Sequence, residues 1–175
     1  MEGAASIFLR ADIRREDGQN MIQWVENHNV TRYLNEYGDI AEQIKTMLAR
    51  TPDYLLTYYF NRDGQFYLVC MEDDRSIGFV KLCGMPHETY EVVYAIGEEA
   101  LWGRGLGHQA FMAALNKAFF EKRARYVDAK IYNSNNRSIC IARHCGMRVV
   151  AQRGNLSVYR VTLDEYLNRP NAVRA

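Results

Sequence analysis

Three glycines occupy alternate positions, Gly103, Gly105 and Gly107, between a strand-like run and the strongest helical pattern in the sequence. Glycine inside a helix costs about 1 kcal/mol relative to alanine, so three of them at a helix start indicate a need for bare backbone. The first amides of a helix have no intrahelical acceptors and lie at the positive end of the helix dipole. The sequence therefore predicts a loop that wraps a phosphate, with Arg104 adding charge at its rim. A tight turn is the alternative, although it needs fewer glycines.

The segments around this loop predict an α+β domain. Runs rich in β-branched and aromatic residues indicate strands, and apolar residues at helical spacing indicate helices. The predicted strands cover residues 7–13, 65–72, 76–84, 89–97, 125–132 and a hairpin over 147–163, and the predicted helices cover 15–30, 39–50, 105–122 and 136–146. Turn-prone residues separate the three runs between 65 and 97, which predicts an antiparallel meander. We expect one domain over 1–175, with a central mixed sheet flanked by helices.

The composition argues against several classes of partner. Lys and Arg number 22 and Asp and Glu 21, and the resulting net charge of +1 predicts no nucleic-acid binding. No apolar run approaches the roughly 20 residues that span a bilayer, and the first residues lack a signal-peptide pattern. The cysteines lack zinc-type spacing, which predicts no metal site and a reduced, cytoplasmic protein. They are Cys70, Cys83, Cys140 and Cys145.

The loop sequence narrows the choice of phosphate ligand. A GKS or GKT motif is absent, which argues against a nucleoside-triphosphate site. Residues 105–110, GLGHQA, match the dinucleotide fingerprint GxGxxA, and Asp128 stands where a ribose-binding acid is expected. A dinucleotide-binding oxidoreductase is therefore an alternative. Against it, the loop begins well beyond the strand that ends near Gly97, and too little chain follows for a doubly wound sheet.

The loop, the helix after it and a later asparagine motif together resemble the GNAT superfamily of acyl-CoA-dependent N-acyltransferases. The family's loop reads Gln/Arg-x-x-Gly-x-Gly/Ala, and residues 102–107, WGRGLG, match it with tryptophan in the first place. That tryptophan is usual in the branch containing ribosomal-protein and polyamine acetyltransferases. The family's later Asn-x-x-Ser and Gly-Phe patterns are matched by residues 135–138 and by Gly146 and Met147. The resemblance covers nearly the whole chain.

The resemblance implies a GNAT-type, mostly antiparallel sheet that splays between its fourth and fifth strands, and acetyl-CoA as co-substrate. Backbone amides of the loop would hold the pyrophosphate, and the end of the fourth strand would pair with the extended pantetheine arm. A turn-forming role is the alternative for the asparagine. The cofactor-binding residues implied are Tyr94, Ala95, Ile96, Gly103, Arg104, Gly105, Leu106, Gly107, His108 and Asn135.

The implied reaction transfers an acetyl group to a primary amine of a small molecule or peptide: a peptide N-terminus, a polyamine or another small amine. With a pKa near 10.4, only about one amine in a thousand or fewer is neutral at pH 7, so a base is needed. Glu91 is the predicted base, because the resembling branch often has glutamate at this place. A glutamate that faces water at a sheet edge is the alternative. We expect a monomer or homodimer.

Two further positions bear on the acceptor and the leaving group. In the family the connection between the first helices covers the acceptor groove, so Tyr33, Glu36 and Tyr37 are the expected substrate contacts, with an ordinary polar loop as the alternative. Many members have a tyrosine, seven residues after the asparagine, that protonates the leaving thiolate. Here that position is Ala142. Tyr132 is a candidate substitute, or no acid is needed, since a thiol with a pKa near 8.5 leaves unprotonated. A coenzyme A-binding module without turnover is thus a second alternative.

Overall fold

The structure is a computed structural model that describes residues 6–34 and 39–169. The chain forms two compact units. The first comprises residues 1–81 and 94–110, and the second comprises residues 82–93 and 111–175. Among the helices of the described ranges, none is both long and apolar enough to cross a membrane.

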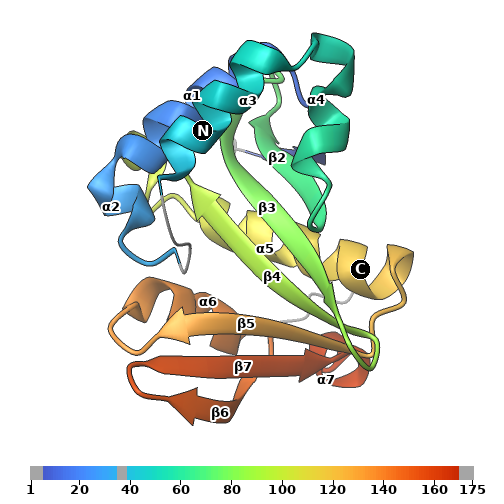
Figure 1. Ribbon diagram of the computed structural model, residues 1–175. Coiled ribbons are helices and arrows are strands. Elements are labelled where there is room, and N and C mark those ends of the chain that lie inside the picture. Colours follow the sequence, from blue (N-terminus) through green and yellow to red (C-terminus); the bar gives the residue numbers. More distant parts are fainter. Residues whose placement is uncertain (1–5, 35–38, 170–175) are drawn as a thin grey trace. The chain divides into compact units, whose positions relative to one another are not determined.

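The strands form a mixed sheet of seven strands in the order β1-β2-β3-β4-β5-β7-β6 (Figure 1). They are β1 (Ile7–Arg10), β2 (Gln65–Met71), β3 (Ser76–Met85), β4 (Thr89–Ile96), β5 (Tyr126–Tyr132), β6 (Arg148–Arg153) and β7 (Leu156–Thr162). The pairs β1–β2, β5–β7 and β6–β7 are antiparallel, whereas β4–β5 is parallel. This confirms the predicted mixed, mostly antiparallel sheet.

The parallel pair is short. It joins Thr89 with Tyr126, Tyr90 with Val127, and Glu91 with Asp128. These residues lie at the start of both strands, and both strands continue beyond the last of these pairs. The register is that of a parallel pair joined only at its beginning, as the predicted splay requires.

The first unit packs helices α1 (Arg15–Glu26) and α3 (Ile40–Arg50) side by side (Figure 1). Gly18 allows this approach, because a Cβ there would lie 2.7 Å from a methyl group of Leu48. A short helix, α2 (His28–Thr31), follows α1. Met21 and Trp24 of α1 are buried, which confirms the apolar residues expected at helical spacing in this helix.

Helix α4 (Asp53–Phe60) was not predicted from the sequence. Leu56 is its buried residue, while Tyr54 and Tyr58 are exposed, so the segment lacks the one-sided apolar pattern that indicates a helix. Pro52 precedes the first turn, where a fixed φ and a missing N–H suit a helix start. The Ile13 amide donates to Thr57 Oγ1 at 3.0 Å and holds the helix in place.

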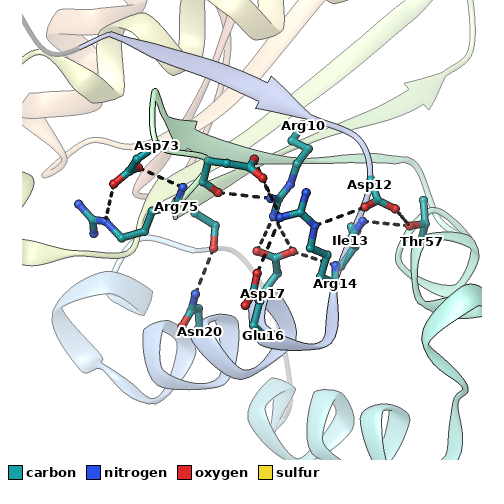
Figure 2. A network of polar contacts seen from close by, with 12 residues as sticks. Arg10, Asp12, Ile13, Arg14, Glu16, Asp17, Asn20, Thr57, Asp73 and Arg75 are labelled. Carbon is teal, nitrogen blue, oxygen red and sulfur yellow. Dashed lines mark hydrogen bonds and ion pairs between the residues drawn. The ribbon is translucent and has the colours of Figure 1, made fainter.

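A partly buried ion cluster joins β1 to the start of α1 and to the turn after β2 (Figure 2). Arg10 Nη2 donates to both carboxylate oxygens of Asp17 at 2.6 Å, and the Arg14 backbone N–H donates to the same carboxylate at 2.8 Å. Asp17 is 1 % exposed. Arg10 and Arg14 also pair with Asp74, and the hydrogen bond from Arg14 lowers the pKa of Asp74. The cluster anchors the first turn of α1.

In the second unit β7 lies between β5 and β6 (Figure 1). Along β5 the side chains alternate: Val127, Ala129 and Ile131 are buried, whereas Asp128 and Lys130 lie on the other face.

The helical segments after β4 are η1 (Glu99–Leu101), α5 (Leu106–Asn116), the π-helical turn η2 (Lys117–Glu121), α6 (Asn136–His144) and α7 (Leu163–Leu167).

Helix α7 was also not predicted. Thr162 caps it, with the Glu165 amide donating to Thr162 Oγ1 and Glu165 Oε2 accepting from the Thr162 amide. Tyr166 is buried, stacks on Phe119 and donates its hydroxyl to Asn116 Oδ1 at 2.9 Å. This contact with distant residues stabilises a helix that is too short to form alone.

Candidate functional site

The glycine loop after β4 adopts the backbone conformation that only glycine takes easily. Gly103 and Gly105 both have a φ of +78°, in the left-handed region, and residues 103–105 are exposed. A Cβ at either glycine would meet nothing within 4 Å. Backbone conformation therefore requires these two glycines, and the space beside them is open. Gly107 differs, since it lies within the first turn of α5.

The start of α5 presents backbone amides next to these glycines. The Gln109 amide donates to the Gly105 carbonyl at 3.1 Å and begins the helical pattern. The amides before it belong to the first turn of the helix, for which helix geometry supplies no intrahelical acceptor. Leu106 is 1 % exposed and anchors the turn, whereas His108 is exposed, and the first turn contains no acidic residue. The turn is suited to an anion.

Trp102 ties the loop to the end of β4. Its indole Nε1 donates to the Ile96 carbonyl oxygen at 2.8 Å. From the sequence, Trp102 stands out only through the family resemblance, and its hydrogen bond to the end of β4 gives a physical reason for the residue. This hydrogen bond holds the start of the loop against the last residue of β4, and the carbonyl oxygen keeps a second lone pair.

Two glycines hold the end of β4 in close packing. A Cβ at Gly97 would lie 2.1 Å from the Trp24 ring, and a Cβ at Gly78 would lie 2.2 Å from the Ala95 carbonyl oxygen. The Gly97 amide also donates to the Ile77 carbonyl at 2.8 Å. Sequence reasoning missed both roles, because the close approach involves residues far away in the chain.

In the second unit, Glu91 on β4 is paired with a lysine. Lys130 Nζ donates to Glu91 Oε2 at 2.7 Å. The side chain of Glu91 is 15 % exposed and that of Lys130 is 39 % exposed. The Glu91 side chain is therefore largely shielded from water, and its role as a base stays a prediction. Lys130 was missed, although its place two residues after Asp128, the register partner of Glu91, puts it on the same face.

A second ion pair lies on this face of the sheet. Arg160 donates to both carboxylate oxygens of Asp128, from Nε at 2.7 Å and from Nη2 at 2.8 Å. This hydrogen bonding raises the pKa of Arg160. The guanidinium also lies over the Tyr126 ring, 4.9 Å from its centroid. We call the surface formed by Glu91, Asp128, Lys130 and Arg160 the charged face. Asp128 is thus engaged by an arginine of its own sheet, which differs from the ribose-binding role considered above.

Asn135 caps helix α6. Its Oδ1 accepts from the Ser138 amide at 3.2 Å, and its Nδ2 donates to Ser138 Oγ at 3.0 Å. The turn-forming role considered for this residue is therefore present. An amide side chain has a second lone pair and a second hydrogen, so capping leaves capacity for a further partner. Binding of coenzyme A by Asn135 stays a prediction.

The position at which many family members have tyrosine lies inside the second unit. Ala142 is 0 % exposed, in the buried face of α6. Tyr132, the candidate substitute, is half-buried at the end of β5. Its proposed role in protonating the thiolate stays a prediction.

The expected acceptor contacts are described only in part. Glu36 and Tyr37 lie outside the described residues. The Arg32 guanidinium lies over the Tyr33 ring, 5.2 Å from its centroid. Asp39 caps α3, since its Oδ1 accepts from the Glu42 amide at 3.0 Å. In the described part of this segment, an arginine therefore already lies against the tyrosine.

Within residues 6–34 and 39–169 there is no group of three or more His, Cys, Asp or Glu side chains that could hold a metal ion. The cysteines described there are free thiols. Burial raises the pKa of Cys70 to about 11 and that of Cys145 to about 12, so both behave as inert core residues.

A mixed sheet with a parallel β4–β5 pair and a glycine loop at the start of the following helix defines a GNAT-type fold. The sequence pattern of the acetyltransferase (GNAT) domain matches residues 7–148, and the chain belongs to this family. No curated protein matches the chain.

Solved structures share the fold at low sequence identity. A spermidine N-acetyltransferase from Vibrio cholerae, in complex with CoA and spermine, is 17 % identical with a TM-score of 0.74, over 93 % of this chain and 98 % of that one. A GNAT-family acetyltransferase from Bacillus anthracis is 16 % identical with a TM-score of 0.72, over 91 % and 96 %. A dodecameric structure of the Vibrio cholerae enzyme is 14 % identical with a TM-score of 0.70, over 97 % and 99 %.

Proposed function

We propose that this protein transfers an acetyl group from acetyl-CoA to the nitrogen of a primary amine. The observation that carries the proposal is the exposed loop with Gly103 and Gly105 in the left-handed conformation, directly before a helix whose first amides have no intrahelical acceptor. Family membership supports the same reaction class. The acceptor is a small molecule or a peptide with a free amine.

The loop would hold the diphosphate of the co-substrate. The amides from Gly103 to His108 are the donors, and Arg104 adds positive charge from an exposed position. The open space beside Gly103 and Gly105 fits this role, because a side chain there would occupy the place of the ligand. The backbone of residues 94–96 is the proposed partner of the pantetheine arm, in the manner of an added strand.

Glu91 is the proposed general base. Its carboxylate would take the proton that the acceptor nitrogen loses, directly or through a water. The nitrogen–carbon bond forms as the carbon–sulfur bond of the thioester breaks, and the released thiolate takes a proton from solvent or from Tyr132. Glu91 is mostly buried and is held by Lys130 at 2.7 Å, so its carboxylate has a defined position. A positioned base contributes roughly 100- to 10,000-fold to a rate.

Ligand binding tests the first part of the proposal. Acetyl-CoA is expected to raise the melting temperature of the protein, whereas NAD and ATP are expected to leave it unchanged. A larger shift with NAD would instead support a dinucleotide-binding oxidoreductase.

Thiol release from acetyl-CoA in the presence of a panel of amines tests turnover. Glu91→Gln is expected to lower kcat by about 100-fold or more with a smaller change in KM, because the base acts on the chemical step. Glu72→Gln, a change at an exposed glutamate in the turn directly after β2, is the matched control and is expected to keep the wild-type rate. Coenzyme A binding without thiol release, across a broad panel, would support a non-catalytic module.

A further inference from the structure

The carboxylate proposed as the base already has a cation of the protein beside it. Lys130 Nζ lies 2.7 Å from Glu91 Oε2, and the lysine is the more exposed partner of the pair. The lysine comes from β5 and the glutamate from β4, two strands joined by the parallel register of Glu91 with Asp128. Lys130 therefore occupies a place that the ammonium group of a cationic acceptor would otherwise take.

The other carboxylate of the charged face, that of Asp128, is also paired with a cation of the protein. Asp128 accepts hydrogen bonds from Nε and Nη2 of Arg160, so its carboxylate already has a bidentate partner. The charged face thus carries two carboxylates and two cations, which sum to no net charge. A polyamine needs carboxylates for its remote ammonium groups, and on this face each carboxylate is already paired.

We infer that Lys130 determines acceptor specificity: it restricts the protein to acceptors whose reacting amine is their single cationic group, such as a peptide N-terminus or a monoamine, and disfavours polyamines. The inference rests on the proposed function and names the acceptor class of the same site. A monoamine loses its charge when Glu91 takes its proton, and no second ammonium then remains. A di- or polyamine keeps a positive charge close to Lys130, and this repulsion weakens its binding.

The test measures thiol release from acetyl-CoA by the whole chain in the presence of different acceptors. The acceptors are an alanine-initiated peptide without lysine or arginine, butylamine, putrescine and spermidine. The wild-type protein is expected to show a higher kcat/KM for the peptide or for butylamine than for spermidine. Lys130→Met is expected to raise the spermidine-to-butylamine ratio of kcat/KM by about fivefold to tenfold, mainly through the KM of spermidine. The gain should shrink in 0.5 M NaCl, because exposed charges are screened over about 4 Å there.

Two variants control for a merely structural effect. Lys45 on α3 is a similarly exposed lysine, with its own ion pairs to Glu26 and Glu42, and Lys45→Met is expected to leave the ratio unchanged. Lys130→Arg keeps the positive charge and is expected to keep the wild-type preference. A circular dichroism spectrum and the acetyl-CoA-dependent melting shift verify that each variant is folded.

Three results would overturn the inference. The first is a wild-type protein that uses spermidine better than the peptide and butylamine. The second is a Lys130→Met ratio within twofold of the wild-type value. The third is an equal change in Lys45→Met or in Lys130→Arg. If the wild-type protein releases no thiol with any of these acceptors, the proposed function is overturned, and this inference falls with it.

Discussion

Replacing Gly105 by glutamate separates the conformational role of this glycine from its role in binding. The residue has a φ of +78°, so a side chain there costs about 1–2 kcal/mol of folding free energy. No crowding adds to this cost, since a Cβ would meet nothing within 4 Å. For a chain of this size, 1 kcal/mol corresponds to about 2–4 °C in Tm. Gly105→Glu is therefore expected to melt about 2–8 °C below the wild-type protein.

The effect on binding is expected to be larger and of a different kind. Acetyl-CoA at 100 times its Kd stabilises a folded protein by about 2.7 kcal/mol. That corresponds to a rise of about 5–11 °C in the Tm of the wild-type protein. A glutamate at position 105 places bulk and negative charge where the diphosphate is expected, so the variant should show no acetyl-CoA-dependent shift. Thermal melts recorded by circular dichroism over an acetyl-CoA titration measure both quantities.

Gly154, in the turn between β6 and β7, is a matched control. It has a φ of +60°, and a Cβ there would also meet nothing within 4 Å. Gly154→Glu is expected to lose stability to a similar extent and yet to keep the full acetyl-CoA-dependent rise in Tm. If Gly105→Glu keeps the shift, the loop does not hold the diphosphate. If both variants lose it, the effect is general and the reasoning fails.

Two further predictions concern stability and thiol chemistry. Asp17→Asn leaves the buried Arg10 without its main counterion and is expected to lower the free energy of unfolding, measured in urea, by about 3–5 kcal/mol. Asp74→Asn, at the exposed side of the cluster, is expected to cost less, and an equal loss in both variants would contradict the role of burial. Burial raises the pKa of Cys145 to about 12, so its thiolate is scarce at pH 8. Mass spectrometry after iodoacetamide treatment is expected to find the exposed Cys140 labelled in the folded protein and Cys145 labelled only after unfolding; comparable labelling of both in the folded state would refute this.

Local patterns in the sequence predicted much of the fold. Each strand of the structure lies within or close to a predicted run, because β-branched and aromatic residues between turn-prone segments specify strands locally. The glycine loop and the helix after it were also predicted from local sequence. Glycine adopts a positive φ easily, and apolar residues at helical spacing indicate a helix. The Asn135 cap is also local, since its side chain bonds Ser138 three residues further on. The two missed helices, α4 and α7, are held by contacts with distant residues such as Thr57 with Ile13 and Tyr166 with Asn116.

The candidate site shows the same difference between features of local sequence and contacts of residues that are distant in the chain. The sequence alone predicted an anion site at the glycine loop and a base at Glu91, because both predictions depend on contiguous residues and on a family resemblance. Only the tertiary structure decided that Lys130 holds Glu91, that Arg160 holds Asp128, and which of the loop glycines are left-handed. The physical reason is that an ion pair between two strands depends on their register, and register arises from packing across the sheet, not from either segment by itself.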